Sequence, residues 1–90
     1  MSDTVRCRVY RASRKAETYL YLRENESEEN LPVELRRLLG RLDPVMELEL
    51  HAGRPLARED VNKVMENLRE RGWHLQMPPP PEISRRALQA

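Results

Sequence analysis

The chain has 90 residues, of which 39% are hydrophobic and 34% charged, and its formal net charge is +1. This length corresponds to one small domain and leaves too little core for a deep, enclosed active site. The nearly balanced charge argues against a dedicated nucleic-acid-binding protein, although a basic segment near the N-terminus survives as a local patch.

A single cysteine, Cys7, excludes an intrachain disulfide and is typical of a reducing compartment. No apolar run approaches the ~20 residues of a membrane span, so no membrane partner is expected. The N-terminal residues lack the apolar region of a signal peptide. We therefore expect a cytoplasmic protein.

Two strands are predicted first, around residues 5–9 and 19–22, where apolar and polar or aromatic side chains alternate. The short polar stretch 11–17 between them predicts a hairpin with an open, basic loop. Residues 24–30 have no apolar side chain and predict an acidic loop.

A short helix is expected after Asn30 and Pro32, because asparagine caps helices and proline is tolerated in the first turn. Its leucines recur on one face, and Gly40 supplies the C-terminal stop. The next segment, 45–50, alternates again and predicts a third strand.

A second, longer helix is predicted to start around Arg58–Asp60, where acidic residues suit the positive end of the helix dipole. The stretch 61–68 has the i, i+3, i+4, i+7 apolar spacing of an amphipathic helix, which Gly72 ends. Residues 73–77 predict a fourth strand. The prolines 78–81 must end its hydrogen-bonding, because proline has no N–H to donate.

The predicted order is β-β-α-β-α-β, an α+β domain over residues 1–81 followed by a C-terminal appendage, 82–90, that is a short helix or disordered. Both helices are expected on one face of a small sheet, over the apolar side chains of all four strands. The other face would be an open polar and aromatic platform. Its predicted members are Arg6, Arg8, Tyr10, Tyr19, Tyr21, Glu47, Glu49, His74 and Gln76.

Several stretches of the chain resemble the YcgL domain family of small bacterial proteins. They include Tyr10-Arg-Ala-Ser-Arg-Lys15, Tyr19-Leu-Tyr-Leu22 and Leu75-Gln-Met-Pro-Pro-Pro80, and the likeness runs from about Cys7 to Pro80. The resemblance implies a compact α/β domain of the proteobacterial cytoplasm. It implies no activity, substrate or cofactor, and it offers no catalytic residues to carry over.

The side chains best suited to a catalytic or metal site are Cys7, His51 and His74. Cys7 belongs to the apolar side of its predicted strand, whereas His74 is expected on the opposite face. Such a cysteine acts as a small hydrophobic residue more often than as a nucleophile. The three do not have a recognised metal-ligand spacing. We expect no enzyme activity, no cofactor and no metal.

Binding functions remain. Tyrosines beside arginines suit the stacking of single-stranded bases, which makes an RNA-associated accessory protein the alternative hypothesis. The main hypothesis is a non-catalytic binding or adaptor module with a protein partner, because tyrosine is enriched at binding hot spots and the prolines would form a wall beside the tyrosine strand. The candidate groove is Tyr10, Arg11, Ser13, Lys15, Tyr19, Tyr21, Gln76, Pro78, Pro79 and Pro80.

Overall fold

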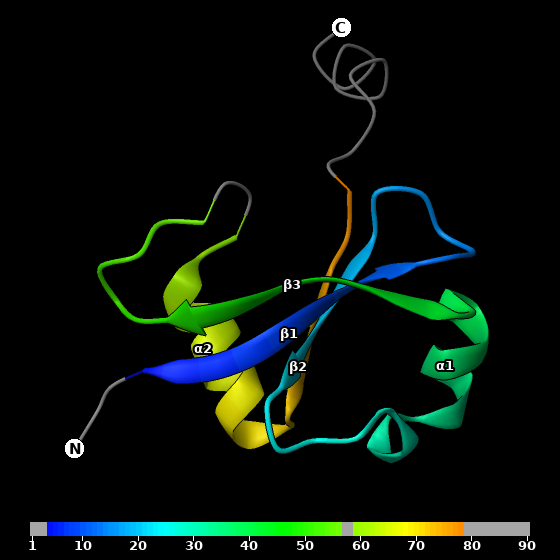
Figure 1. Ribbon diagram of the computed structural model, residues 1–90, viewed down its shortest axis with the longest axis horizontal. Helices are drawn as coiled ribbons and strands as arrows, with labels where there is room; N and C mark the ends of the chain where they lie inside the picture. Colours follow the sequence, from blue (N-terminus) through cyan, green and yellow to red (C-terminus); the bar gives the residue numbers. More distant parts are fainter. Residues whose placement is uncertain (1–3, 57–58, 79–90) are drawn as a thin grey trace, which may run out of the picture.

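The computed structural model describes residues 4–56 and 59–78 (Figure 1). The α+β class and the predicted order of strands and helices are confirmed. The predicted boundary between the domain and its appendage, at residues 81 and 82, lies outside the described residues. The elements are β1 (Val5–Ala12), β2 (Tyr19–Arg23), the 3-10 turn η1 (Glu28–Asn30), α1 (Val33–Leu39), β3 (Leu42–Leu50), α2 (Val61–Glu70) and β4 (Trp73–Gln76).

The four strands form one sheet in the order β3-β1-β2-β4, and every neighbouring pair is antiparallel. Because β2 and β3 both run antiparallel to β1, they are parallel to each other, and α1 lies in the crossover between them. β3 and β4 are the edges of the sheet. No helix within the described ranges is long and apolar enough to cross a membrane.

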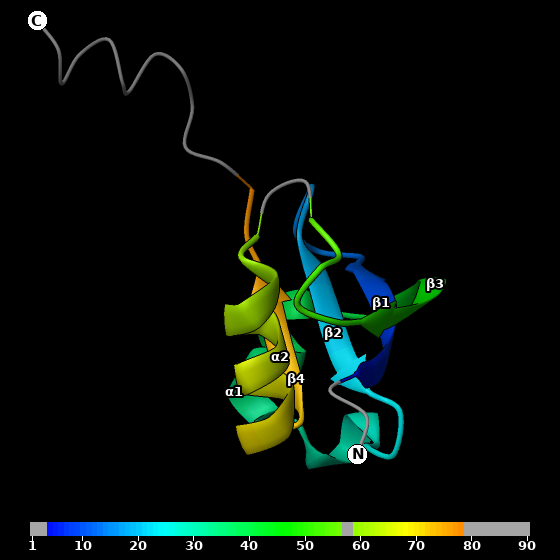
Figure 2. The same cartoon turned by 90° about the vertical axis from the view of Figure 1, so that its left-hand side faces the viewer.

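The two helices cover opposite faces of the sheet, so the prediction of both helices on one face is wrong. In Figure 1, β2 and β4 lie between α2 and α1. Figure 2 shows α2 in front of the sheet and α1 behind it. The sheet therefore forms the middle layer of the domain.

The register between β1 and β2 explains this arrangement. Val9 pairs with Tyr21, and directly opposed residues in an antiparallel pair share a face. Tyr21 therefore lies with Val9, while Leu20 projects to the other side. The prediction had placed the leucines of β2 with Val9, and a change of one residue in register moves every side chain of a strand to the opposite face.

Each face has its own apolar core. The α2 face consists of Val5, Cys7, Val9, Tyr21, Leu50, Val61, Val64, Met65 and Leu68, with Tyr19, Leu48 and Leu56 packed against it. The α1 face consists of Tyr10, Ala12, Leu20, Leu22, Leu31 and Leu39, with Leu35, Leu42, Trp73 and Leu75 packed against it. Because β1 and β2 contribute to both cores, most of the predicted platform is covered. Its members on β1 and β3 are exposed, namely Arg6, Arg8, Glu47 and Glu49, and Arg6 forms an ion pair with Glu49 at 3.5 Å.

Most helix ends follow the predicted signals, but the prediction of Asn30 as the cap of α1 is wrong, because Asn30 ends η1 and Pro32 is the N-cap residue, without a side-chain hydrogen bond. The side chain of Asp60 caps α2 by accepting a hydrogen bond from the backbone N–H of Asn62 at 2.9 Å. Pro32 precedes α1, where its missing N–H has no intrahelical partner. Gly40 ends α1 with φ of +73°, a conformation that favours glycine.

β3 is longer than predicted and contains a proline. Val9 pairs with Met46 and Tyr10 pairs with Pro44, so Val45 is the extra residue of a β-bulge. Proline is tolerated here because β3 is an edge strand with no neighbour on its outer side. The alternation of residues 45–50 could not reveal this extension, since Leu42–Pro44 lacks the pattern.

Candidate functional site

The predicted tyrosine platform does not exist as an open surface. Tyr10 is 7% exposed and packs on the α1 face, while Tyr21 is 6% exposed and packs on the α2 face. The prediction that these two rings share an open face is wrong, because the register places them on opposite sides of the sheet. Tyr19 is half-buried and retains some solvent contact.

Tyr21 is instead part of a partly buried polar cluster on the α2 face. Its hydroxyl donates to Oε1 of Gln76 at 2.7 Å, and its ring meets the His74 imidazole edge to face, with centroids 5.6 Å apart. Burial raises the pKa of Tyr21, and the nearby carboxylate of Glu59 raises it further. The predicted site residues Tyr21 and Gln76 therefore contact each other, with Tyr21 buried and Gln76 half-buried.

His74 completes this cluster with two partners that the sequence did not indicate. Its Nε2 lies 3.2 Å from a carboxylate oxygen of Glu59, and its Nδ1 lies 2.9 Å from Nδ2 of Asn67. Glu59 precedes α2 and Asn67 lies within it, so the three residues meet only because α2 packs against β4. No linear spacing predicts that contact.

Cys7 lies on the same face as His74, contrary to the prediction that they face opposite sides. Burial raises the pKa of the Cys7 thiol to about 11, and the opposing effect of Arg54 is smaller. The thiol is therefore protonated at neutral pH, whereas nucleophilic attack requires the thiolate. Within residues 4–56 and 59–78, no three histidine, cysteine, aspartate or glutamate side chains are grouped as metal ligands would be.

Four of the predicted site residues do come together, at the end of the β1–β2 hairpin. Arg11, Ser13, Lys15 and Tyr19 line one shallow hollow of about 570 Å³. We call it the hairpin hollow. Its other lining residues are Ala12, Arg14, Ala16, Glu17, Arg41 and Asp43.

Backbone hydrogen bonds hold the hairpin loop against the junction of α1 and β3. The N–H of Ser13 donates to the carbonyl of Arg41 at 2.9 Å, and the N–H of Arg14 donates to the carbonyl of Leu39 at 3.1 Å. The loop runs next to the end of α1 in Figure 1. Two segments that are remote in sequence therefore build one surface.

A second shallow hollow, of about 380 Å³, lies next to the first and shares Arg41 with it. We call it the α1 hollow, because most of its residues come from α1 and its C-terminal end. It is lined by Glu28, Val33, Arg36, Arg37, Gly40, Arg41 and Leu42. The guanidinium of Arg14 donates to the carbonyl of Arg37 at 3.4 Å and so connects the two hollows.

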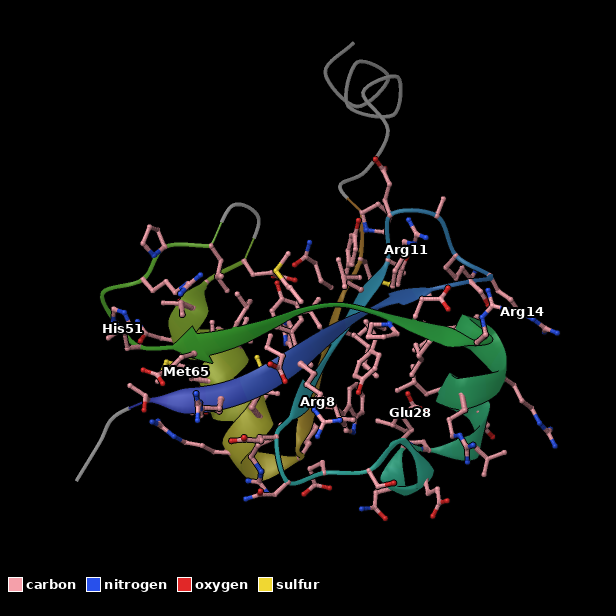
Figure 3. All side chains as sticks on the ribbon, viewed as in Figure 1. Arg8, Arg11, Arg14, Glu28, His51 and Met65 are labelled. Atoms are coloured by element: carbon pink, nitrogen blue, oxygen red, sulfur yellow. The ribbon has the colours of Figure 1, made fainter. Side chains whose placement is uncertain are left out.

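Six exposed cations gather around these hollows and form what we call the basic end of the molecule: Arg11, Arg14, Lys15, Arg36, Arg37 and Arg41. In the part of the chain that the structure describes, only Arg41 has an ion-pair partner among them, Asp43 at 2.9 Å. Figure 3 shows Arg11 and Arg14 on the side of the hairpin loop and α1, remote from His51. The other five cations are available to an anionic ligand.

The predicted proline wall is only partly within the described residues. Pro78 is half-buried, two positions beyond the end of β4. Pro79 and Pro80 lie outside the described residues, so their part in the predicted groove stays a prediction.

Comparison with known proteins agrees with the resemblance found in the sequence. The sequence-family model of the YcgL domain matches residues 7–79. A YcgL domain-containing protein of Azotobacter vinelandii is 42% identical over 76 residues, which cover 84% of this chain and 78% of the relative. One from Thioalkalivibrio sulfidiphilus is 45% identical over 71 residues, 79% of this chain and 88% of the relative. One from Pseudomonas aeruginosa is 47% identical over 73 residues, 81% of this chain and 75% of the relative.

Proposed function

The chain belongs to the YcgL domain family, and we propose that it is a non-catalytic binding module of the bacterial cytoplasm that docks a protein partner at its basic end. One observation carries the proposal: Arg11, Ser13, Lys15 and Tyr19, expected to bind from the sequence, line one hollow. The family names of the relatives state no activity, so the proposal rests on this surface.

The charge arrangement supports binding at this end. The whole chain carries a formal charge of only +1, yet six cations line the two adjoining hollows against three carboxylates, Glu17, Glu28 and Asp43. Exposed arginines without carboxylate partners keep their donors free for bidentate contacts with anionic groups. A concentrated positive patch also speeds the encounter with a negatively charged partner.

The non-catalytic part of the proposal rests on the chemistry of the buried groups. The thiol of Cys7 is held in its protonated form by burial. Both nitrogens of the His74 imidazole contact protein side chains, those of Asn67 and Glu59, so a substrate would have to displace one of them before the ring could act as a general base. Both groups are better suited to holding the α2 face together than to reacting with a substrate.

RNA is the alternative partner, and the five cations that have no ion-pair partner among the described residues favour it, because arginine also binds phosphate. The burial of Tyr10 and Tyr21 weighs against it, since single-stranded bases are normally held by stacking on exposed aromatic rings. Tyr19 is the one tyrosine that lines the hairpin hollow. A protein partner needs no such stacking platform.

Photo-cross-linking in living cells tests the proposal. A photoreactive amino acid replaces Ala16, which is exposed in the hairpin hollow, and a matched control replaces Lys63, which is exposed on α2. We expect a discrete protein adduct from position 16 that position 63 does not give. The adduct should disappear when Arg14→Glu and Lys15→Glu are combined and persist in Lys63→Glu.

A nuclease-sensitive adduct at position 16 would show that the partner is RNA and not a protein. If position 16 gives the same adducts as position 63, the basic end is not a docking surface and the proposal fails. Circular dichroism of each variant establishes that lost cross-linking reflects changed charge and not unfolding.

A further inference from the structure

The α1 hollow is lined by two apolar side chains and three arginines, and Glu28 is the one carboxylate among its described lining residues. Val33 and Leu42 line it together with Arg36, Arg37 and Arg41. Val33 is 58% exposed, so its apolar side chain lies open to contact beside these arginines. Apolar side chains surrounded by polar groups are the usual composition of a protein-binding site.

Helix geometry places these residues on one outward face of α1. Arg36 and Arg37 follow Val33 by three and four positions, so the three side chains are neighbours one turn apart. The buried face of the same helix consists of Leu35 and Leu39, four residues apart, which pack on the sheet. The outward face therefore has no structural task in the described domain.

Two features of this hollow favour a protein over RNA. None of the described residues that line it is aromatic, so they offer no ring on which a base could stack. The exposed apolar surface of Val33 gains nothing from a phosphate chain, whereas it gains from covering by an apolar side chain. Carboxylates next to that side chain would meet Arg36 and Arg37, which lack ion-pair partners among the described residues.

We propose that the α1 hollow binds an acidic, amphipathic segment of a partner protein. A large apolar side chain of the segment covers Val33 and Leu42, and flanking carboxylates pair with Arg36 and Arg37. Further carboxylates reach the hairpin hollow through the shared Arg41. This inference rests on the proposed function and names the chemistry of the partner.

Fluorescence anisotropy with the full chain tests the inference at an ionic strength of about 0.15 M, where exposed charges are largely screened beyond a Debye length. Three labelled probes are compared: a short peptide alternating glutamate and leucine, the same peptide with serine for leucine, and a single-stranded RNA of similar charge. We expect the glutamate–leucine peptide to bind about tenfold more tightly than the other two probes, a difference of about 1.4 kcal/mol.

Variants divide the two parts of the inference. Combining Arg36→Glu with Arg37→Glu should lower the affinity for both peptides by at least about tenfold. Val33→Asp should remove the advantage of the leucine peptide over the serine peptide. Lys63→Glu, an exposed change on α2, should leave all affinities unchanged.

Equal affinities for the two peptides would overturn the apolar part of the inference. If neither peptide binds, the whole inference is overturned. Tighter binding of RNA, lost in the double arginine variant, would assign the hollow to nucleic acid. The cross-linking from position 16 judges the proposed function separately, since a protein adduct there can appear even if both peptides fail.

Discussion

The hydroxyl of Tyr21 donates a hydrogen bond of 2.7 Å to Oε1 of Gln76. The two residues belong to β2 and to the edge strand β4, and the bond crosses their interface diagonally, since the residue opposite Tyr21 is His74. Residues expected to bind a partner thus hold the edge of the sheet.

Tyr21→Phe should lower the free energy of unfolding by about 1 kcal/mol, because it removes this bond and keeps the ring. Tyr21→Ala should cost about 3–5 kcal/mol through the cavity it leaves. Urea denaturation measures both. In a Gln76→Met background, Tyr21→Phe should cost clearly less, because the acceptor is already gone. A Tyr21→Phe protein as stable as the natural one would show that the bond contributes nothing.

The sequence predicted the elements of this fold better than their pairing. The helix signals at Asp60 and Gly40 are local: α2 begins directly after Asp60, and α1 ends directly before Gly40. Which side chains of β2 share a face with Val9 could not be predicted in this way, because both the tyrosines and the leucines of Tyr-Leu-Tyr-Leu are apolar enough to be buried. Only the register to β1 decides between them, and the loop from Ser13 to Thr18 is too long to fix the register as a two-residue turn does.

The candidate site was predictable to the extent that it is continuous in sequence. Arg11, Ser13 and Lys15 belong to one loop, and their basic character is visible in the chain. Arg36 and Arg37 join them only because the loop packs against the end of α1. That contact depends on tertiary structure, so it could not be inferred from composition or spacing.

The contacts of His74 predict which nitrogen of its neutral ring carries the proton. Nδ2 of Asn67 can only donate, so Nδ1 must accept, and Nε2–H then donates to Glu59. The amide orientation is supported by Oδ1 of Asn67, which accepts from Arg71 at 3.4 Å. Long-range ¹H–¹⁵N NMR should show the Nε2–H tautomer, and Asn67→Asp should change the ring signals. A neutral ring protonated at Nδ1 would contradict this hydrogen-bond assignment.

Alkaline pH should destabilise the protein through Cys7. Burial raises the pKa of its thiol from 9.0 to about 11, so the unfolded chain releases this proton first as pH rises. The contribution of the buried Cys7 thiol to the free energy of unfolding is complete below pH 9 and is lost between pH 9 and about 11. The two-unit shift corresponds to about 2–3 kcal/mol. Tyr21, whose pKa is also raised, acts in the same direction at higher pH.

Cys7→Ala is the matched variant for this pH effect. It should be less stable at neutral pH because it leaves a small cavity, but its stability should fall less steeply over the alkaline range. Urea denaturation at several pH values measures both slopes. Parallel curves for the two proteins would assign the alkaline loss to other groups.

Gly40 should tolerate no side chain, because it controls how closely the hairpin loop approaches α1. Its φ of +73° and ψ of −148° belong to a region that is essentially limited to glycine. An added Cβ would lie 2.5 Å from Cγ of Arg14 and 2.7 Å from Oγ of Ser13. Gly40→Ala therefore has both a strained backbone and a steric overlap, at a cost of about 1–3 kcal/mol.

The matched control is Gly53→Ala. Gly53 has no positive φ, and the nearest atom to an added Cβ is Nδ1 of His51 at 3.4 Å. This substitution should change the free energy of unfolding by less than about 0.5 kcal/mol. Amide NMR signals of Ser13 and Arg14 should shift in Gly40→Ala and stay in place in Gly53→Ala. Equal stabilities and unshifted signals in both variants would mean that the loop and α1 are not held together through Gly40. Since Arg14 and Lys15 move with that loop, Gly40→Ala should also weaken cross-linking from position 16.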